Sequence, residues 1–130
     1  MSPGLIKVLL IAGGGAVGAL CRYGLAGVIQ SRFAASSFFP WGTMAVNVLG
    51  CLVMGILWVF VEERSLLRPE MQDLLMVGLV GAFTTFSTFG LETVQLIDDR
   101  QWLAAGANVA GSVIVGIVAV LGGMALARSL

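Results

Sequence analysis

The sequence predicts an all-α integral membrane protein, and three observations support this fold class. Hydrophobic residues make up 58% of the 130 residues, charged residues only 11%, and the mean hydropathy is +1.01. A soluble domain would carry about 25% charged residues. The apolar residues form four runs of about 20 residues or more, the length that a helix needs to cross the hydrocarbon core. The abundant glycines lie inside these runs, which is typical of closely packed membrane helices.

The four runs leave no room for a soluble domain, so residues 1–130 are predicted to form a single four-helix transmembrane domain. The predicted spans are, in order, Leu5–Gln30, Gly42–Val61, Leu74–Ile97 and Trp102–Ala127. The first span carries Gly14 and Gly18, a GxxxG spacing that lets a second helix approach closely. The second span ends before the charged segment EERSLLRPE, and the third ends before DDR. The fourth span is apolar and rich in glycine as far as Arg128.

Basic residues are divided almost equally between the two sides of the membrane. With four crossings, the N-terminus, the second loop and the C-terminus share one side. The basic residues on that side are Lys7, Arg64, Arg68 and Arg128, and those on the other side are Arg32 and Arg100, with Arg22 near one helix end. Orientation follows the cytoplasmic excess of Lys and Arg, which is small here. The count is therefore consistent with insertion in both orientations.

Polar side chains occur at membrane depth, where each is costly and is therefore a candidate for function. They are Thr43, Asn47, Thr84, Thr85, Ser87, Thr88, Glu92, Thr93, Asn108 and Ser112. Thr43 and Asn47 are four residues apart and share a helix face, as do Asn108 and Ser112. The residues could form a polar stripe, or the hydroxyls could bond back to carbonyls of their own helices. The amide of Asn47 is harder to satisfy locally because it has two N–H donors.

The segment GAFTTFSTFG, residues 81–90, is unusual for a membrane span because hydroxyl groups and phenylalanines replace aliphatic side chains. It can be a continuous helix, or a break bracketed by Gly81 and Gly90 in which hydroxyls satisfy the freed backbone groups. A break would present helix N-termini and free carbonyls, which are features of an ion site near the bilayer midplane.

The phenylalanines of this segment, Phe83, Phe86 and Phe89, recur every three residues. Ordinary packing is one explanation. The other is that ring edges, which carry partial positive charge, face a small dehydrated anion. Uncharged donors of this kind suit a channel, because binding must be weak enough to let the ion leave.

Two charged side chains fall within or near the spans, and each has two interpretations. Arg22 either snorkels to the membrane interface or contributes to an electropositive vestibule that collects anions. Glu92 either lines a water-filled vestibule or carries protons in a coupled transporter. Cys21 and Cys51 lie in apolar runs and are predicted to be small buried residues without a disulfide.

The composition argues against several classes of function. The chain has no His, which removes the Ser–His nucleophile and the usual zinc ligand sets. No glycine-rich stretch carries the lysine of a phosphate-binding loop. The net charge is zero and no basic patch is present, so nucleic acid is not an expected partner. We therefore expect a protein that is not an enzyme.

Three segments together resemble a known set of membrane-helix motifs. They are GGGAVGALCRYGLAG at residues 13–27, GTMAVNVLG at residues 42–50 and GAFTTFSTF at residues 81–89. These segments are similar to the first-, second- and third-helix motifs of the Fluc (CrcB) family of fluoride channels. The third motif is highly specific, and the chain length and four-helix plan fit as well. The resemblance covers essentially the whole chain.

The resemblance implies a fluoride-selective ion channel. Such a channel exports fluoride from the cytoplasm by passive electrodiffusion and so reduces fluoride toxicity. It implies a multi-pass protein of the cell inner (plasma) membrane. It also implies a dual-topology homodimer in the lipid bilayer, with antiparallel subunits and a broken third helix in each.

The resemblance also implies roles for individual residues. Those expected along the fluoride pore are Asn47, Phe86, Phe89, Thr43, Ser87, Thr88 and Ser112, with Arg22 and Glu92 at a vestibule. The backbone carbonyls of Gly81 and Thr84 are expected to hold a structural sodium ion between the subunits. The sequence departs from the family pattern at Met44, where Leu is frequent, and at Ala82–Phe83, where GL is frequent.

Three alternatives remain at the level of sequence. A small proton-coupled antiporter shares the size and the dual topology, but it requires a carboxylate early in the first span, which has none. A fluoride/proton exchanger in the same fold would depend on Glu92. A membrane subunit without transport would leave the hydroxyl-rich segment unexplained.

Overall fold

The computed structural model describes residues 2–33 and 38–130, and every regular element in these ranges is a helix. The elements are α1 (Pro3–Phe33), α2 (Trp41–Trp58), η1 (Val59–Glu63), α3 (Pro69–Gln72), η2 (Asp73–Val80), α4 (Gly81–Phe83), α5 (Phe86–Asp98) and α6 (Trp102–Ser129), of which η1 and η2 are π-helical. The stretches of the described chain that are long and apolar enough to cross a membrane are Pro3–Phe33, Trp41–Glu63, Pro69–Asp98 and Trp102–Ser129. The prediction of an all-α chain with four helices apolar enough to span a membrane is therefore confirmed.

The helices extend beyond the predicted spans at most of their ends. The first runs over Pro3–Phe33 where Leu5–Gln30 was expected, and the third begins at Pro69 where Leu74 was expected. Hydropathy identifies the residues that lie in hydrocarbon, whereas backbone hydrogen bonding continues through polar residues at the membrane surface. The third span begins at Pro69 because proline suits the first position of a helix and favours extended backbone at Arg68 before it.

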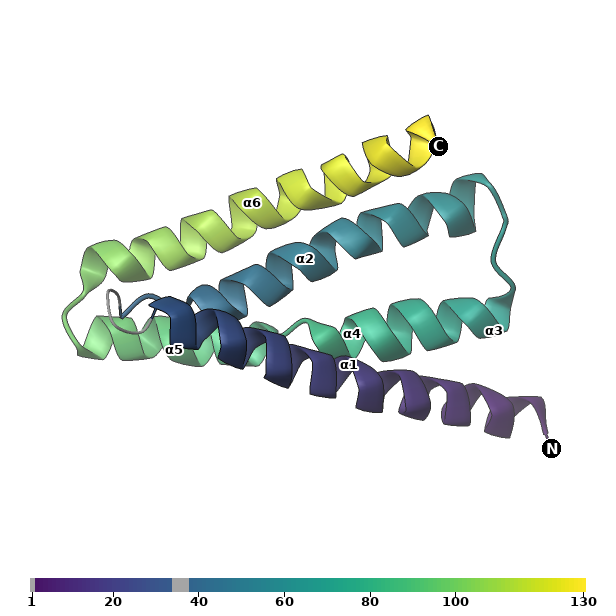
Figure 1. Cartoon of the computed structure of the whole chain (residues 1–130), viewed down its shortest axis with the longest axis horizontal. Helices are drawn as coiled ribbons and strands as arrows, with labels where there is room; N and C mark the ends of the chain where they lie inside the picture. The colour runs from purple at the N-terminus through teal and green to yellow at the C-terminus, as the bar shows by residue number, and fades with distance from the viewer. Residues whose placement is uncertain (1, 34–37) are drawn as a thin grey trace.

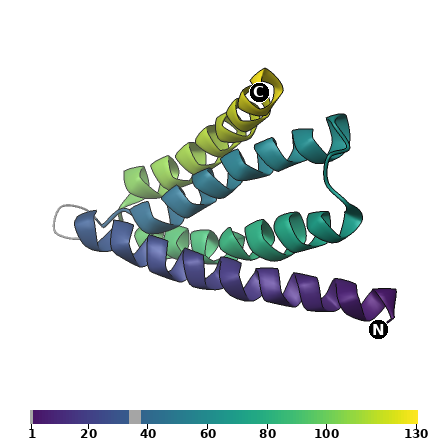
Figure 2. The ribbon, with the colours of Figure 1, turned by 45° about the vertical axis from the view of Figure 1, so that its right-hand side comes forward.

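The spans alternate in direction along the chain. Figure 1 shows the N-terminus, the α2–α3 connection and the C-terminus at one end of the bundle. The C-terminal end of α1, the start of α2 and the α5–α6 connection lie at the other end. Helix α6 lies along α2, and α1 lies along η2 and α4 (Figures 1 and 2). The third span thus contacts α1 through its first half and approaches α6 through α5.

Helices α2 and α6 touch backbone to backbone through two glycines. A Cβ atom added to Gly55 would overlap the carbonyl oxygen of Val120, and one added to Gly123 would overlap that of Leu52. The same relation holds between α1 and η2, where a Cβ on Gly18 would overlap the carbonyl oxygen of Leu79. Close approach of this kind is the main source of helix association in a membrane, because lipid is as apolar as the side chains.

Ion pairs connect the helix ends where the two termini lie. Lys7 Nζ lies 3.1 Å from Asp73 Oδ1 and so joins α1 to η2. Arg128 Nε donates to both carboxylate oxygens of Glu63, at 3.1 and 3.0 Å, and so joins α6 to η1. Each end of the bundle has equal numbers of acidic and basic residues. The first end has Lys7, Arg64, Arg68 and Arg128 with Glu62, Glu63, Glu70 and Asp73; the second has Arg32 and Arg100 with Asp98 and Asp99, while Arg22 and Glu92 lie within their helices.

The glycine contacts between α2 and α6 predict different effects for two adjacent substitutions. Gly123→Ala should lower the free energy of unfolding by about 1–3 kcal/mol, because the new methyl group meets a carbonyl oxygen that cannot move independently. Gly122→Ala is the matched control, since a Cβ there meets nothing within 4 Å. Gly122→Ala should leave the free energy of unfolding unchanged or raise it by up to about 1 kcal/mol, because alanine has the higher helix propensity. Unfolding midpoints in detergent micelles provide the measurement, and equal midpoints for the two variants would contradict the packing analysis.

Candidate functional site

The helical backbone of the third span is interrupted between α4 and α5 (Figure 1). Thr84 has φ −88° and ψ 160°, and Thr85 has φ −150° and ψ 121°, both extended. β-Branched residues adopt extended backbone readily. Thr85 then starts α5, because its Oγ1 accepts a hydrogen bond from the Thr88 N–H at 3.3 Å, the usual function of an N-cap threonine.

Asn47 on α2 binds the interrupted backbone with both edges of its amide. Its Oδ1 accepts from the Thr85 N–H at 2.7 Å, and its Nδ2 donates to the Thr85 carbonyl at 3.0 Å. In a continuous helix the Thr85 N–H would bond to Gly81 and the Thr88 N–H to Thr84. Both N–H groups are diverted to side chains here, so the carbonyls of Gly81 and Thr84 lose their usual helical donors.

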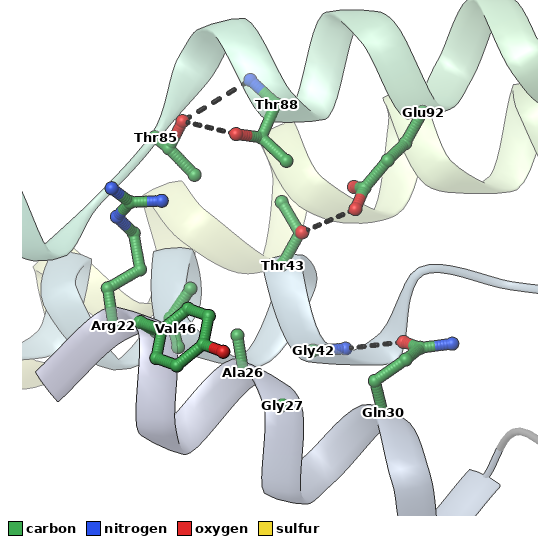
Figure 3. Close-up of a pocket in the computed structure, with 11 residues that line it drawn as sticks. Arg22, Ala26, Gly27, Gln30, Gly42, Thr43, Val46, Thr85, Thr88 and Glu92 are labelled. Atoms are coloured by element: carbon green, nitrogen blue, oxygen red, sulfur yellow. Dashed lines mark hydrogen bonds between the residues drawn. The ribbon is translucent and has the colours of Figure 1, made fainter. Parts of the chain in front are cut away.

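A cavity of about 270 Å³ lies between α1, α2 and the start of α5 (Figure 3). Its polar lining comes from Arg22, Tyr23, Gln30, Thr43, Thr85, Thr88 and Glu92. Arg22 lies within α1, and its Nε donates to the Ala82 carbonyl at 3.3 Å, next to the interruption. The side chain is therefore directed into the bundle and does not extend to a helix end.

Glu92 lies across the same cavity from Arg22 (Figure 3). Its Oε1 accepts a hydrogen bond from Thr43 Oγ1 at 2.8 Å. Its Oε2 is buried and has no hydrogen-bond partner among the residues that the structure describes. The cavity thus combines one guanidinium, one carboxylate and several hydroxyl groups.

A second cavity, of about 210 Å³, lies beside the same interruption and is lined by Asn47, Cys51, Thr84, Thr85 and Phe86. Thr85 lines both cavities. The cavity on the Arg22 side of the interruption and the cavity on the Phe86 side therefore share a lining residue. Cys51, which the sequence suggested was a simple buried residue, is half-buried at this second cavity, and Cys21 is exposed, so the prediction of a buried residue is wrong for Cys21.

The three phenylalanines of residues 81–90 lie in different surroundings. Phe83 lines a wholly apolar cavity with Leu79 and Val80. Phe86 is 84% exposed on the chain, and its ring centroid lies 5.6 Å from that of the half-buried Phe89, with the planes at 42°. Phe83 thus has the surroundings of a packing residue, whereas Phe86 projects from the chain beside polar backbone.

The remaining expected positions are more scattered. Ser87 and Gly81 are exposed on the chain. Ser112 lies on α6, where its Oγ donates to Asn108 Oδ1 at 3.5 Å. The structure thus brings together Arg22, Thr43, Asn47, Thr88 and Glu92 around the interruption, with Ser112 on a separate polar contact.

Gln30, which the sequence did not single out, and Asn108, which it identified only as a polar residue within a span, both have well-defined contacts. Gln30 lines the first cavity; its Oε1 accepts from the Gly42 N–H at 3.0 Å and its Nε2 donates to the Phe39 carbonyl at 3.2 Å, so it fixes the start of α2 (Figure 3). Asn108 is 1% exposed and donates to Thr93 Oγ1 at 2.9 Å. An isolated amide in an apolar run was the available sequence signal for both.

Comparison with known proteins gives a consistent result along nearly the whole chain. Residues 9–124 match the family model described as "CrcB-like protein, Camphor Resistance (CrcB)". A protein of Maridesulfovibrio salexigens is 48% identical over 94% of this chain and 95% of its own length. Proteins of Nitratidesulfovibrio vulgaris and Nitrosococcus oceani are each 43% identical over 94% of this chain and over 97% and 96% of their own lengths.

All three relatives are named fluoride-specific ion channel FluC. The matched range includes the interrupted third span, Asn47 and both polar cavities. The family model covers far more than half of the chain, and the relatives exceed 40% identity over most of it. The chain therefore belongs to the CrcB family.

Proposed function

We propose that the protein is a fluoride-selective ion channel that lets fluoride leave the cytoplasm down its electrochemical gradient. The observation that supports this most is the interruption of the third span, where uncharged donors and a projecting phenylalanine lie at membrane depth. It occurs in a chain whose relatives, at 43–48% identity, are named fluoride-specific ion channels. Channels need ligands that bind an ion weakly, and uncharged donors meet that condition.

Fluoride would be stabilised by donors around the interruption. Asn47 uses one N–H on the Thr85 carbonyl, and an amide has two, so one remains for the ion. The N-terminus of α5 contributes the positive end of its helix dipole. The ring edges of Phe86 and Phe89 carry partial positive charge. The hydroxyl groups proposed along or near the path belong to Thr43, Ser87, Thr88 and Ser112.

We place Arg22 and Glu92 at the vestibule of this path. Both line the larger cavity, so opposite charges lie on one water-accessible surface. A guanidinium beside the path raises the local concentration of anions. Its bond to the Ala82 carbonyl and the neighbouring carboxylate prevent it from acting as a strong anion trap.

Two copies in antiparallel orientation form the proposed channel, and each third helix is broken at Thr84–Thr85. Extended backbone at membrane depth must be covered by protein or water, because lipid cannot satisfy its polar groups. In one protomer this region leaves Gly81, Phe86 and Ser87 exposed, and a second copy would cover them. The near-equal division of Lys and Arg between the two sides gives little preference for one orientation.

A sodium ion would suit the centre of such a dimer. The carbonyls of Gly81 and Thr84 have lost their usual helical donors, because Thr85 and Thr88 direct their N–H groups to side chains. Carbonyl oxygens are hard ligands of the kind that bind oxygen-preferring cations. Two copies would supply four such oxygens, so the residues present fit a structural cation whose charge also compensates for the nearby carbonyl dipoles.

Passive conduction across the inner (plasma) membrane is sufficient for protection. HF crosses membranes as a neutral molecule and ionises inside, so fluoride accumulates in the cytoplasm when the surroundings are acidic. The inside-negative potential drives the anion outward, by about 2.3 kcal/mol per charge per 100 mV. Chloride must be excluded, since its passage would dissipate that potential.

Ion flux from liposomes tests the proposed function and separates it from proton exchange. Purified protein should release trapped fluoride only when a potassium ionophore balances the charge, because uncoupled efflux builds up a potential. Chloride-loaded liposomes should release little. Fluoride release that needs no ionophore and follows an imposed pH gradient would instead indicate an exchanger dependent on Glu92.

Isoleucine substitutions test the role of the phenylalanine ring edges. Ile is apolar and somewhat smaller, so stability should fall by on the order of 1 kcal/mol. It offers no electropositive edge, and a deficit of about 3–4 kcal/mol at the barrier would reduce flux at least about a hundredfold. We expect this loss in Phe86→Ile and in Phe89→Ile. Phe83→Ile is the control, because Phe83 lines an apolar cavity. Wild-type flux in both test variants, with dimers intact by size exclusion, would restore the packing explanation.

The proposed assembly predicts two properties of the purified protein in membranes. A single tag at the C-terminus should be accessible from both membrane faces, since the two copies insert in opposite directions. Replacing sodium by a bulky organic cation should weaken the dimer, and sodium itself should not be transported. A tag confined to one face would exclude the antiparallel arrangement, and a dimer indifferent to sodium would exclude the cation site.

A further inference from the structure

Asn108 on α6 is the most deeply buried polar side chain in the described part of the structure, with 1% of its surface exposed. An amide in such surroundings is costly unless it is hydrogen-bonded. Its Nδ2 donates to Thr93 Oγ1 on α5 at 2.9 Å. Its Oδ1 accepts from Ser112 Oγ at 3.5 Å, the weaker of the two contacts. The principal interaction of Asn108 is therefore with α5.

Thr93 connects Asn108 to the backbone carbonyl of Phe89. A hydroxyl has one proton to donate, and Thr93 Oγ1 gives it to the Phe89 carbonyl at 2.7 Å. Its oxygen remains free to accept from Asn108. Two hydrogen bonds in series through one hydroxyl strengthen each other by polarisation. The pair fixes the helical turn between Phe89 and Thr93 against α6.

Apolar packing does little to hold α5 in place. Within α5, all of which the structure describes, Leu96 is the single buried residue. The other side-chain connections from neighbouring helices are the hydrogen bond of Thr43 to Glu92, the residue just before Thr93, and the contact of Asn47 with Thr85 at the start of α5. Asn108 supplies the polar contact from α6. The rotation of α5 about its axis therefore depends on a small number of side-chain hydrogen bonds.

Rotation of α5 decides where the Phe89 ring lies. The ring is half-buried, with its centroid 5.6 Å from that of Phe86, so neighbouring side chains leave part of its surface uncovered. An aromatic edge stabilises an anion only when it points at the ion. We infer that Asn108 and Thr93 are positioning residues, which hold the Phe89 ring edge in the fluoride path through the Phe89 carbonyl. The inference rests on the proposed channel function.

Substitutions at Thr93 test this role with closely matched side chains. Thr93→Val keeps the shape and removes the hydroxyl, and it should reduce fluoride efflux per dimer about tenfold, the scale of one lost hydrogen bond. Thr93→Ser keeps the hydroxyl and should restore most of the flux. Ser31→Ala is the control, since the hydroxyl of Ser31 donates to the Val28 carbonyl of its own helix at 2.9 Å, and Ser31 lines neither polar cavity.

A double-substitution cycle separates positioning of Phe89 from a general structural effect. In a Phe89→Ile background, Thr93→Val should change the flux less than about twofold, because the ring it positions is absent. An equal tenfold loss in both backgrounds would overturn the inference, as would unchanged flux in Thr93→Val alone. If Thr93→Val does not give an intact dimer, Asn108→Asp is used in its place. Aspartate keeps the volume of asparagine and removes the donor to Thr93. Wild-type protein that fails to conduct fluoride would refute the proposed function itself, independently of these variants.

Discussion

The structure depends on the need to satisfy backbone polar groups where water is absent. An unpaired N–H or carbonyl in hydrocarbon costs several kcal/mol, so extended residues within a span require a partner. Asn47 is that partner for Thr85, since it both donates to and accepts from the same residue. Its side chain replaces the bonds that a neighbouring helical turn would supply. The second half of the third span can then begin as a separate helix, with its own cap and its own direction.

This single pairing determines much of the surrounding site. Because Thr85 is held by α2, polar cavities exist beside the interruption on the Arg22 side and on the Phe86 side. Arg22 approaches from α1 and bonds to the Ala82 carbonyl, so α1 and α2 both contribute to the same few residues. Thr43 on α2 and Asn108 on α6 form further side-chain hydrogen bonds with α5. Helices distant in sequence therefore meet at a short stretch of irregular backbone.

The sequence predicts the spans well because hydropathy is a local property and four long apolar runs leave few alternatives. It also identifies residues 81–90 as unusual, since hydroxyls and β-branched residues cluster there. The partners of these residues depend on helix packing and could not be predicted from local pattern. Asn47 was expected to face an ion, but its contacts with Thr85 give it a structural role as well. Gln30 was overlooked and Asn108 was identified without a partner for the same reason, because their importance comes from the backbone or side chain opposite them.

The glycine contacts between α2 and α6 also have a genetic consequence. Every coding change at a glycine codon adds at least a Cβ atom, so no replacement at Gly55 or Gly123 is sterically neutral. A change of side chain on the opposite helix does not remove this overlap, because the group that the new Cβ meets is the backbone carbonyl of Val120 or Leu52. Every amino acid carries that oxygen, so no second-site substitution at the contact can make room. A substitution at either glycine therefore cannot be compensated by a second substitution at the contact. Two side chains that touch elsewhere in the bundle can be substituted together.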